Sequence, residues 1–196
     1  MRKISVLLFP LLAIALLMAV ASGTAAAQSA AAVGDNSIYF VTYFANNVSA
    51  APDATVRLVN DGDTAGDLWA AFYVFDDSEE LTECCACEIT PDGLLAEDVK
   101  TQLTANPLTG KVPTRGVIKT ISSSSLDPTA VIPTAGLRGW ATHIQLATKT
   151  TYGITETALT DSNLTATEET LLQNLCFYDS LLSGLPCTCT PEDHDF

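Results

Sequence analysis

Basic side chains are scarce in this sequence. Its 196 residues include 9 Lys and Arg against 23 Asp and Glu, and the formal net charge is −14. Proteins that bind nucleic acids use Lys and Arg to neutralise phosphates, and the same cations attract anionic membrane surfaces. The composition therefore argues against a nucleic-acid-binding protein and against binding to an acidic membrane.

Motifs that carry catalysis are absent as well. The sequence has no G-x-S-x-G, phosphate-binding loop, dinucleotide fingerprint or H-E-x-x-H. Its two histidines, His143 and His194, lie in no motif typical of a catalytic base. We therefore expect a protein that is not an enzyme, with no catalytic residue and no cofactor.

Long apolar runs are confined to the N-terminus. Arg2 and Lys3 precede an apolar run over residues 4–20, and Ala25-Ala26-Ala27 offers a cleavage site. We predict a signal peptide over residues 1–27 and a small, polar, mobile lead over residues 28–36. Retention of the run as an anchor is the alternative, and Pro10 within it favours cleavage. We expect no membrane span after cleavage and a secreted, periplasmic or cell-surface protein.

From residue 37 onward the chain reads as one β domain. Segments rich in β-branched and aromatic residues alternate with turn residues. The predicted strands cover 37–44, 54–60, 68–75, 115–122, 139–147 and 151–159. This pattern predicts a mainly β fold, an immunoglobulin-like antiparallel β-sandwich over residues 37–196.

Two of these strands carry specific expectations. Residues 68–75 are apolar on both faces, which is typical of a central strand covered on each side. In residues 139–147, Trp140 and Ile144 alternate with His143, so we expect Trp140 and Ile144 in the core and His143 facing away from it.

One helix is predicted near the C-terminus, over residues 165–183. Thr165 and Glu168 form a capping box. Apolar residues recur at helical spacing and are expected to pack on the sheet, with Cys176 on the flank of that stripe. The stripe consists of Leu171, Leu175, Tyr178 and Leu182.

The cysteines fall into two groups of three. The first group is Cys84, Cys85 and Cys87, and the second is Cys176, Cys187 and Cys189. In an exported protein an even number of cysteines predicts a disulfide framework. Adjacent cysteines rarely bond to each other, so bonds between the two groups are favoured. We expect them to tie the helix and the tail onto the sheet.

Two other chemistries fit the same cysteines. C-C-x-C with a distant C-x-C offers thiolates for copper or zinc. A reactive cysteine is the weaker alternative, because the carboxylates around the first group raise a thiol pKa and suppress the nucleophilic thiolate.

An acidic turn is the remaining candidate site. Residues 60–67, NDGDTAGD, present oxygen ligands from Asp61, Asp63 and Asp67. The turn fails the EF-hand pattern because Ala65 and Phe72 replace two ligands. We expect an acidic turn without an ion and retain the three aspartates as calcium candidates.

The segment YVFDDSEELTECCACEITPDGLL, together with the terminal CTC, resembles an uncharacterised family of exported cysteine-containing bacterial proteins, found in acidobacteria-like genomes. The likeness extends from about Ala54 onward, and its most distinctive part is C-C-x-C-x-x-T-P-x-G-L. The resemblance implies export and a shared cysteine framework. It implies no activity or ligand.

These observations predict a secreted or cell-surface structural or interaction protein whose partner is an unknown protein or glycan. The alternatives are a periplasmic or extracellular copper- or zinc-binding protein and, less favoured, an exported hydrolase. A subunit of an extracellular filament or assembly is a further possibility, since the strand over residues 37–44 could add to a neighbour's sheet and allow self-association.

Overall fold

A computed structural model describes residues 38–64, 66–104 and 112–183, which all belong to one compact unit. The predicted signal peptide and lead, as well as Cys187, Cys189 and His194, lie outside the described residues. The elements are β1 (Tyr39–Phe44), β2 (Thr55–Asn60), β3 (Leu68–Asp76), β4 (Leu81–Ile89), β5 (Leu94–Asp98), β6 (Gly116–Ser123), β7 (Leu137–Leu146), β8 (Tyr152–Ala158) and α2 (Ala166–Ser183).

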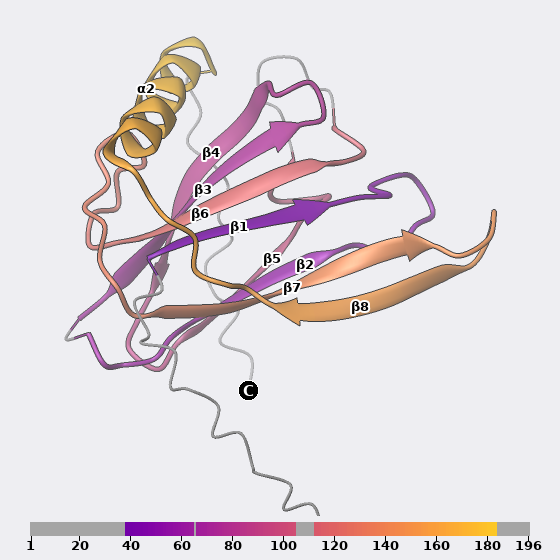
Figure 1. Ribbon diagram of the computed structural model, residues 1–196, viewed down its shortest axis with the longest axis horizontal. Coiled ribbons are helices and arrows are strands. Elements are labelled where there is room, and N and C mark those ends of the chain that lie inside the picture. Colours follow the sequence, from indigo (N-terminus) through magenta and orange to yellow (C-terminus); the bar gives the residue numbers. More distant parts are fainter. Residues whose placement is uncertain (1–37, 65, 105–111, 184–196) are drawn as a thin grey trace, which may run out of the picture. The chain divides into compact units, whose positions relative to one another are not determined.

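The strands form two four-stranded antiparallel sheets (Figure 1). Sheet A has the order β1-β6-β3-β4, and sheet B has the order β5-β2-β7-β8. The described part of the chain is therefore mainly β with one C-terminal helix, as predicted. Within that part, no helix is long and apolar enough to cross a membrane.

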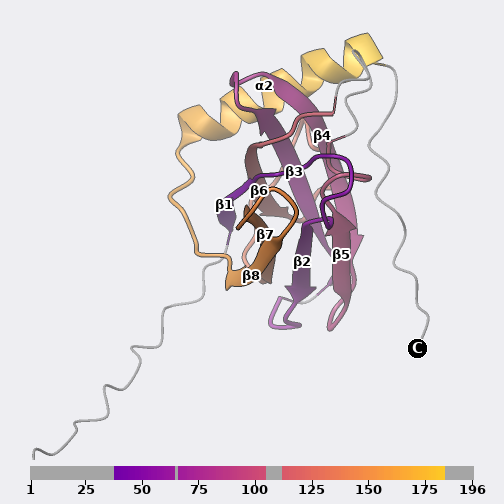
Figure 2. The same ribbon diagram turned by 90° about the vertical axis from the view of Figure 1, so that its right-hand side faces the viewer.

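β3 is the central strand of sheet A, as its two apolar faces predicted. It pairs with β6 on one side and with β4 on the other. Phe72 faces the sandwich interior, Tyr73 faces the opposite side, and both are fully buried. Sheet A thus has a core on each face, because sheet B covers one face and α2 covers the other (Figure 2).

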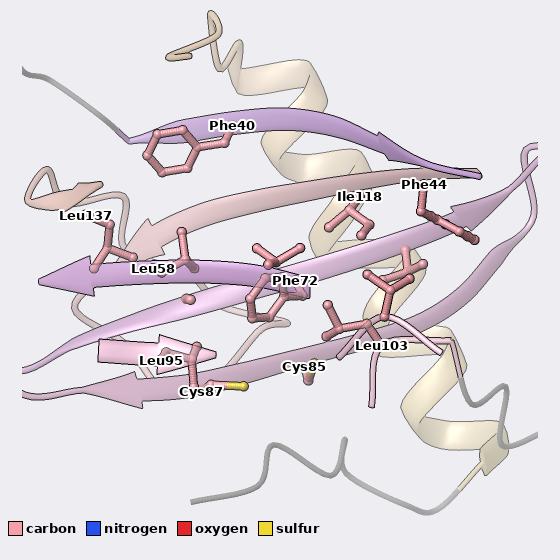
Figure 3. Close-up of a cluster of buried hydrophobic side chains, with 14 of the residues drawn as sticks. Phe40, Phe44, Leu58, Phe72, Cys85, Cys87, Leu95, Leu103, Ile118 and Leu137 are labelled. Carbon is pink, nitrogen blue, oxygen red and sulfur yellow. The ribbon is translucent and has the colours of Figure 1, made fainter. Parts of the chain in front are cut away.

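The main core lies between the two sheets (Figure 3). Side chains from both sheets meet there in the alternating pattern of half-buried strands. The largest are Phe40, Phe44, Leu58, Phe72, Ile118 and Leu137. Leu95, on β5, covers the same core from the edge of sheet B.

β7 differs from its predicted orientation. His143 is buried, and its ring stacks on Tyr43 at a centroid distance of 4.2 Å. Its Nδ1 lies 3.1 Å from the Tyr43 carbonyl oxygen and its Nε2 lies 2.9 Å from Thr157 Oγ1. A carbonyl only accepts, so Nδ1–H donates to the Tyr43 carbonyl, and Nε2 shares a hydrogen bond with the Thr157 hydroxyl.

The prediction for β7 is therefore wrong for His143 and Trp140, because the core between the sheets accepts small side chains at positions 139 and 141. Trp140 is 39% exposed, while its neighbours Gly139 and Ala141 face the core. A Cβ on Gly139 would lie 2.4 Å from Leu58 Cδ2, so a side chain at this point would have to displace Leu58. Ile144 is buried as expected.

Among the glycines of these strands, Gly116 at the start of β6 has the closest neighbouring atoms. A Cβ there would lie 1.9 Å from the Phe75 carbonyl oxygen and 2.9 Å from the Phe44 ring. We expect Gly116→Ala to lower the free energy of unfolding by about 2–3 kcal/mol, because overpacking forces backbone shifts.

Gly153→Ala is the matched control, since Gly153 lies on the exposed strand β8 and the atom nearest to a Cβ there, the Gln145 carbonyl oxygen, would be 4.0 Å away. Urea unfolding of both variants checks the prediction, and equal effects would contradict it.

Candidate functional site

The first cysteine group lies on a strand that the sequence analysis did not predict. β4 runs antiparallel to β3, with Cys84 opposite Tyr73 and Cys85 opposite Phe72. Side chains alternate along a strand, so Cys84 faces α2 while Cys85 and Cys87 face the sandwich interior. Three cysteines close in sequence are thereby divided between two cores.

A disulfide joins β4 to α2. Cys84 and Cys176 are bonded across 92 residues, with their Cα atoms 5.7 Å apart. This bond links the two cysteine groups, as predicted. Cys87 is also disulfide-bonded, and the remaining cysteines of the second group lie outside the described residues. Sulfurs held in disulfides are not thiolate ligands, so this arrangement disfavours a metal site built on both groups.

A buried carboxylate accompanies the cysteines inside the sandwich. Glu97, on β5, is fully buried, and its Oε1 lies 3.8 Å from Cys87 Sγ. A disulfide sulfur carries no hydrogen, so this contact is a hydrogen bond only when Glu97 holds the proton. Burial, with a smaller effect of the Asp98 charge, raises the Glu97 pKa to about 7.

Sequence reasoning missed Glu97, because a glutamate in a strand usually faces solvent. Its Oε2 has no hydrogen-bond partner within the described residues. Leu95 and Glu97 are two positions apart, so in a strand they share one face, and both are buried on β5. This spacing was the available signal in the sequence.

The aspartates of the acidic turn do not gather around one point among the described residues. No three His, Cys, Asp or Glu side chains of that part of the chain are grouped to hold an ion. Asp61 instead holds neighbouring groups of the protein. Its carboxylate accepts hydrogen bonds from Arg138 Nε at 3.1 Å and from the Asp63 amide at 3.1 Å. Asp63 and Asp67 are exposed.

The N-terminus of α2 is held by a polar contact with sheet A. The Thr165 hydroxyl accepts a hydrogen bond from the Glu168 amide at 3.1 Å, which confirms the Thr165 half of the predicted capping box. The Glu168 carboxylate accepts from the Tyr39 hydroxyl at 3.2 Å and from Lys119 Nζ. Burial, followed by the charge of Glu168, raises the Tyr39 pKa, so the hydroxyl remains a donor.

The buried face of α2 is not the predicted one. Leu172 and Cys176, one helical turn apart, are the residues that enter the core beneath the helix. The disulfide decides this orientation, because Cys176 has to point at β4. Most of the predicted stripe is left outside that core: Leu171, Tyr178 and Leu182 are exposed, and Leu175 is half-buried.

α2 therefore presents large apolar side chains to solvent. We call this set the α2 surface. Each member is at least 47% exposed: Leu171, Phe177, Tyr178, Leu181 and Leu182. Most amphipathic helices on a domain surface bury such residues and expose charged ones.

A groove of about 300 Å³ adjoins the α2 surface where the helix lies over sheet A. Leu171 and Leu175 form its helix side, and Phe75 and Val117 form its sheet side. Lys119 lies over the Phe75 ring at 5.1 Å. Asp76 and Glu79, at the β3–β4 turn, complete its lining. The groove is thus apolar inside and charged at its rim.

Comparisons with known proteins add little to this geometry. No family model and no curated protein matches the sequence. A crystal structure of Thermotoga maritima 1070 is similar at 14% identity, with a TM-score of 0.41, over 65% of this chain and 97% of that chain. A likeness this distant carries no argument about the protein's function.

Removing the Cys84–Cys176 disulfide tests how α2 is held. We expect the double variant Cys84→Ala and Cys176→Ala to lose about 2–4 kcal/mol of unfolding free energy, because this crosslink between positions 92 residues apart no longer restricts the unfolded chain. Amide exchange should accelerate in α2 and change little in β7. Equal acceleration in both elements would contradict a local role of the bond.

Glu97 should make stability depend on pH. Its raised pKa means that the folded state binds a proton more tightly than the unfolded state, so stability falls as pH rises from about 4.5, the ordinary pKa of a glutamate, to about 7. Relative to Glu97→Gln, the wild-type protein should lose about 3 kcal/mol of unfolding free energy between about pH 4 and pH 8. Denaturant unfolding at several pH values measures this difference, and parallel pH profiles would overturn the assignment.

Proposed function

We propose that this protein is an exported, disulfide-stabilised interaction domain that binds a partner protein through the α2 surface. The observation that carries the proposal is the row of exposed apolar side chains on α2. Contiguous exposed apolar patches mark interaction sites in soluble proteins. The proposal makes α2 a binding element in addition to a cover for the sheet.

The covalent attachment of α2 supports this function. The disulfide and the contact of Glu168 with Lys119 hold the helix on sheet A at two places. A binding surface held in place before the partner arrives loses less conformational entropy on association. The disulfide is also consistent with an oxidising compartment outside the cytoplasm.

The immunoglobulin-like layout and the exported family remain predictions. An immunoglobulin constant-type domain places its first, second, fifth and fourth strands in one sheet. Here β1 pairs with β6, and β2 lies in the other sheet. The packing of two antiparallel sheets supports the layout, while this strand order differs from that of a constant-type immunoglobulin domain.

Assembly through the first strand is less well supported than binding through α2. β1 is already paired with β6 along its length. On its other edge, the Asp161 carboxylate accepts hydrogen bonds from the Ile38 and Tyr39 amides, and the Ser162 amide donates to the Tyr39 carbonyl. A neighbouring chain would have to displace these contacts.

Site-specific photo-crosslinking tests the proposed function. A benzoylphenylalanine in place of Tyr178 should yield a discrete adduct in the exported fraction of the source cells, because this position lies within the α2 surface. The same group in place of Leu126, which is 68% exposed on a loop, is the matched control.

Adding Leu181→Glu and Leu182→Glu to the Tyr178 probe should remove the adduct. The same adducts at both probe positions, or none at position 178, would count against an α2 binding function.

A further inference from the structure

The groove beside α2 carries information about the chemistry of the partner. This step rests on the proposed function, because it concerns the same surface. The walls of the groove are apolar, and its volume of about 300 Å³ suits the insertion of apolar side chains. Polar sugars would find few hydrogen-bond donors there, so a protein segment fits the lining better than a glycan.

The rim of the groove is acidic. The β3–β4 turn has the sequence Asp76-Asp77-Ser78-Glu79-Glu80. Buried Asp76 shapes this turn, because its carboxylate accepts hydrogen bonds from the Ser78 amide at 2.8 Å and the Glu80 amide at 3.1 Å. Glu79 adopts a positive φ of 66° in the turn and lines the groove, and Glu80 is exposed beside it.

Among the residues that the structure describes, the two cations near this rim already form ion pairs. Lys119 pairs with Glu168, and Arg115 donates to the Asp77 carboxylate at 2.7 Å. Glu79 and Glu80 are in excess of these two pairs, so the local field at the open side of the groove is negative.

This charge selects among possible occupants. A second copy would bring an identical acidic turn against this one, and the chain carries a net charge of −14. The chain's own terminal sequence offers no complement either, because its last residues include Glu192, Asp193 and Asp195. An anionic membrane would be repelled in the same way. A basic partner would be attracted by the acidic rim, whereas each of these three occupants would be repelled by it.

We propose that the groove binds an amphipathic helical segment of a partner protein, with apolar side chains inserted between α2 and sheet A and flanking Lys or Arg residues held by Glu79 and Glu80. This is helix-in-groove recognition, in which residues spaced three and four apart anchor one face. The exposed residues of α2 continue the apolar contact beyond the groove.

Three synthetic helical peptides test the proposal against the full chain. All carry Leu at the same heptad positions, and the remaining positions are Lys, Gln or Glu. Fluorescence anisotropy should give the Lys peptide at least about tenfold tighter binding than the Gln peptide at low salt, and weaker binding at an ionic strength of about 0.5 M. The Glu peptide should bind least.

Two pairs of variants locate the binding. Glu79→Gln with Glu80→Gln should weaken the Lys peptide about three- to tenfold. Asp63→Asn with Asp67→Asn removes the same charge at the opposite end of β3 and should change little. Leu171→Glu should abolish binding, whereas Leu126→Glu, at an exposed loop residue, should not.

The outcomes separate this inference from the proposed function. If all three peptides bind alike and Leu171→Glu abolishes binding, the α2 surface binds apolar segments and the charge inference is overturned. If both charge variants weaken the Lys peptide equally, the attraction is general and the groove assignment is overturned. If no peptide binds, the proposal of a basic helical partner is overturned. A concentration-dependent dimer that is lost in Leu171→Glu overturns it as well. In both cases the crosslinking experiment still decides the proposed function.

Discussion

The Cys84–Cys176 disulfide is the constraint on which the rest of this architecture depends. It joins a central part of β4 to the middle of α2 across 92 residues. Because Cys176 has to face the sheet, Leu172 is buried with it and the apolar stripe through Tyr178 points elsewhere. One covalent bond therefore determines both how the helix closes the second core and which side chains it offers to a partner.

Sheet A is suited to this arrangement because its central strand has two apolar faces. Phe72 contributes to the core between the sheets, and Tyr73 contributes to the core under α2. The Tyr73 hydroxyl is satisfied there by donating to the Pro128 carbonyl at 2.7 Å. The polar contact of Glu168 with Tyr39 and Lys119 then holds the first turn of the helix. Packing, hydrogen bonding and the disulfide thus act on the same interface.

The described cysteines have separate physical roles even though they are close in sequence. Cys84 holds α2, while Cys85 and Cys87 fill the sandwich core beside the buried carboxyl of Glu97. The surface chemistry is separate from this buried chemistry. The groove and its acidic rim depend on the β3–β4 turn and on α2, and the stability of the core depends on sulfur and on the proton of Glu97. A change in pH would act on the core between the sheets through Glu97, whereas reduction of the Cys84–Cys176 bond would act on α2.

Sequence patterns alone determined the β class, the central position of β3, the helix with its Thr165 cap and a disulfide between the two cysteine groups. These properties follow from local periodicity, capping chemistry and the rarity of disulfides between adjacent cysteines. Side-chain orientation was decided only by the tertiary structure. His143 is buried because Tyr43 and Thr157 satisfy its ring, and the α2 stripe is exposed because the disulfide turns the helix. Periodicity identifies the faces of an element, but which face is buried depends on contacts with residues far away in the chain.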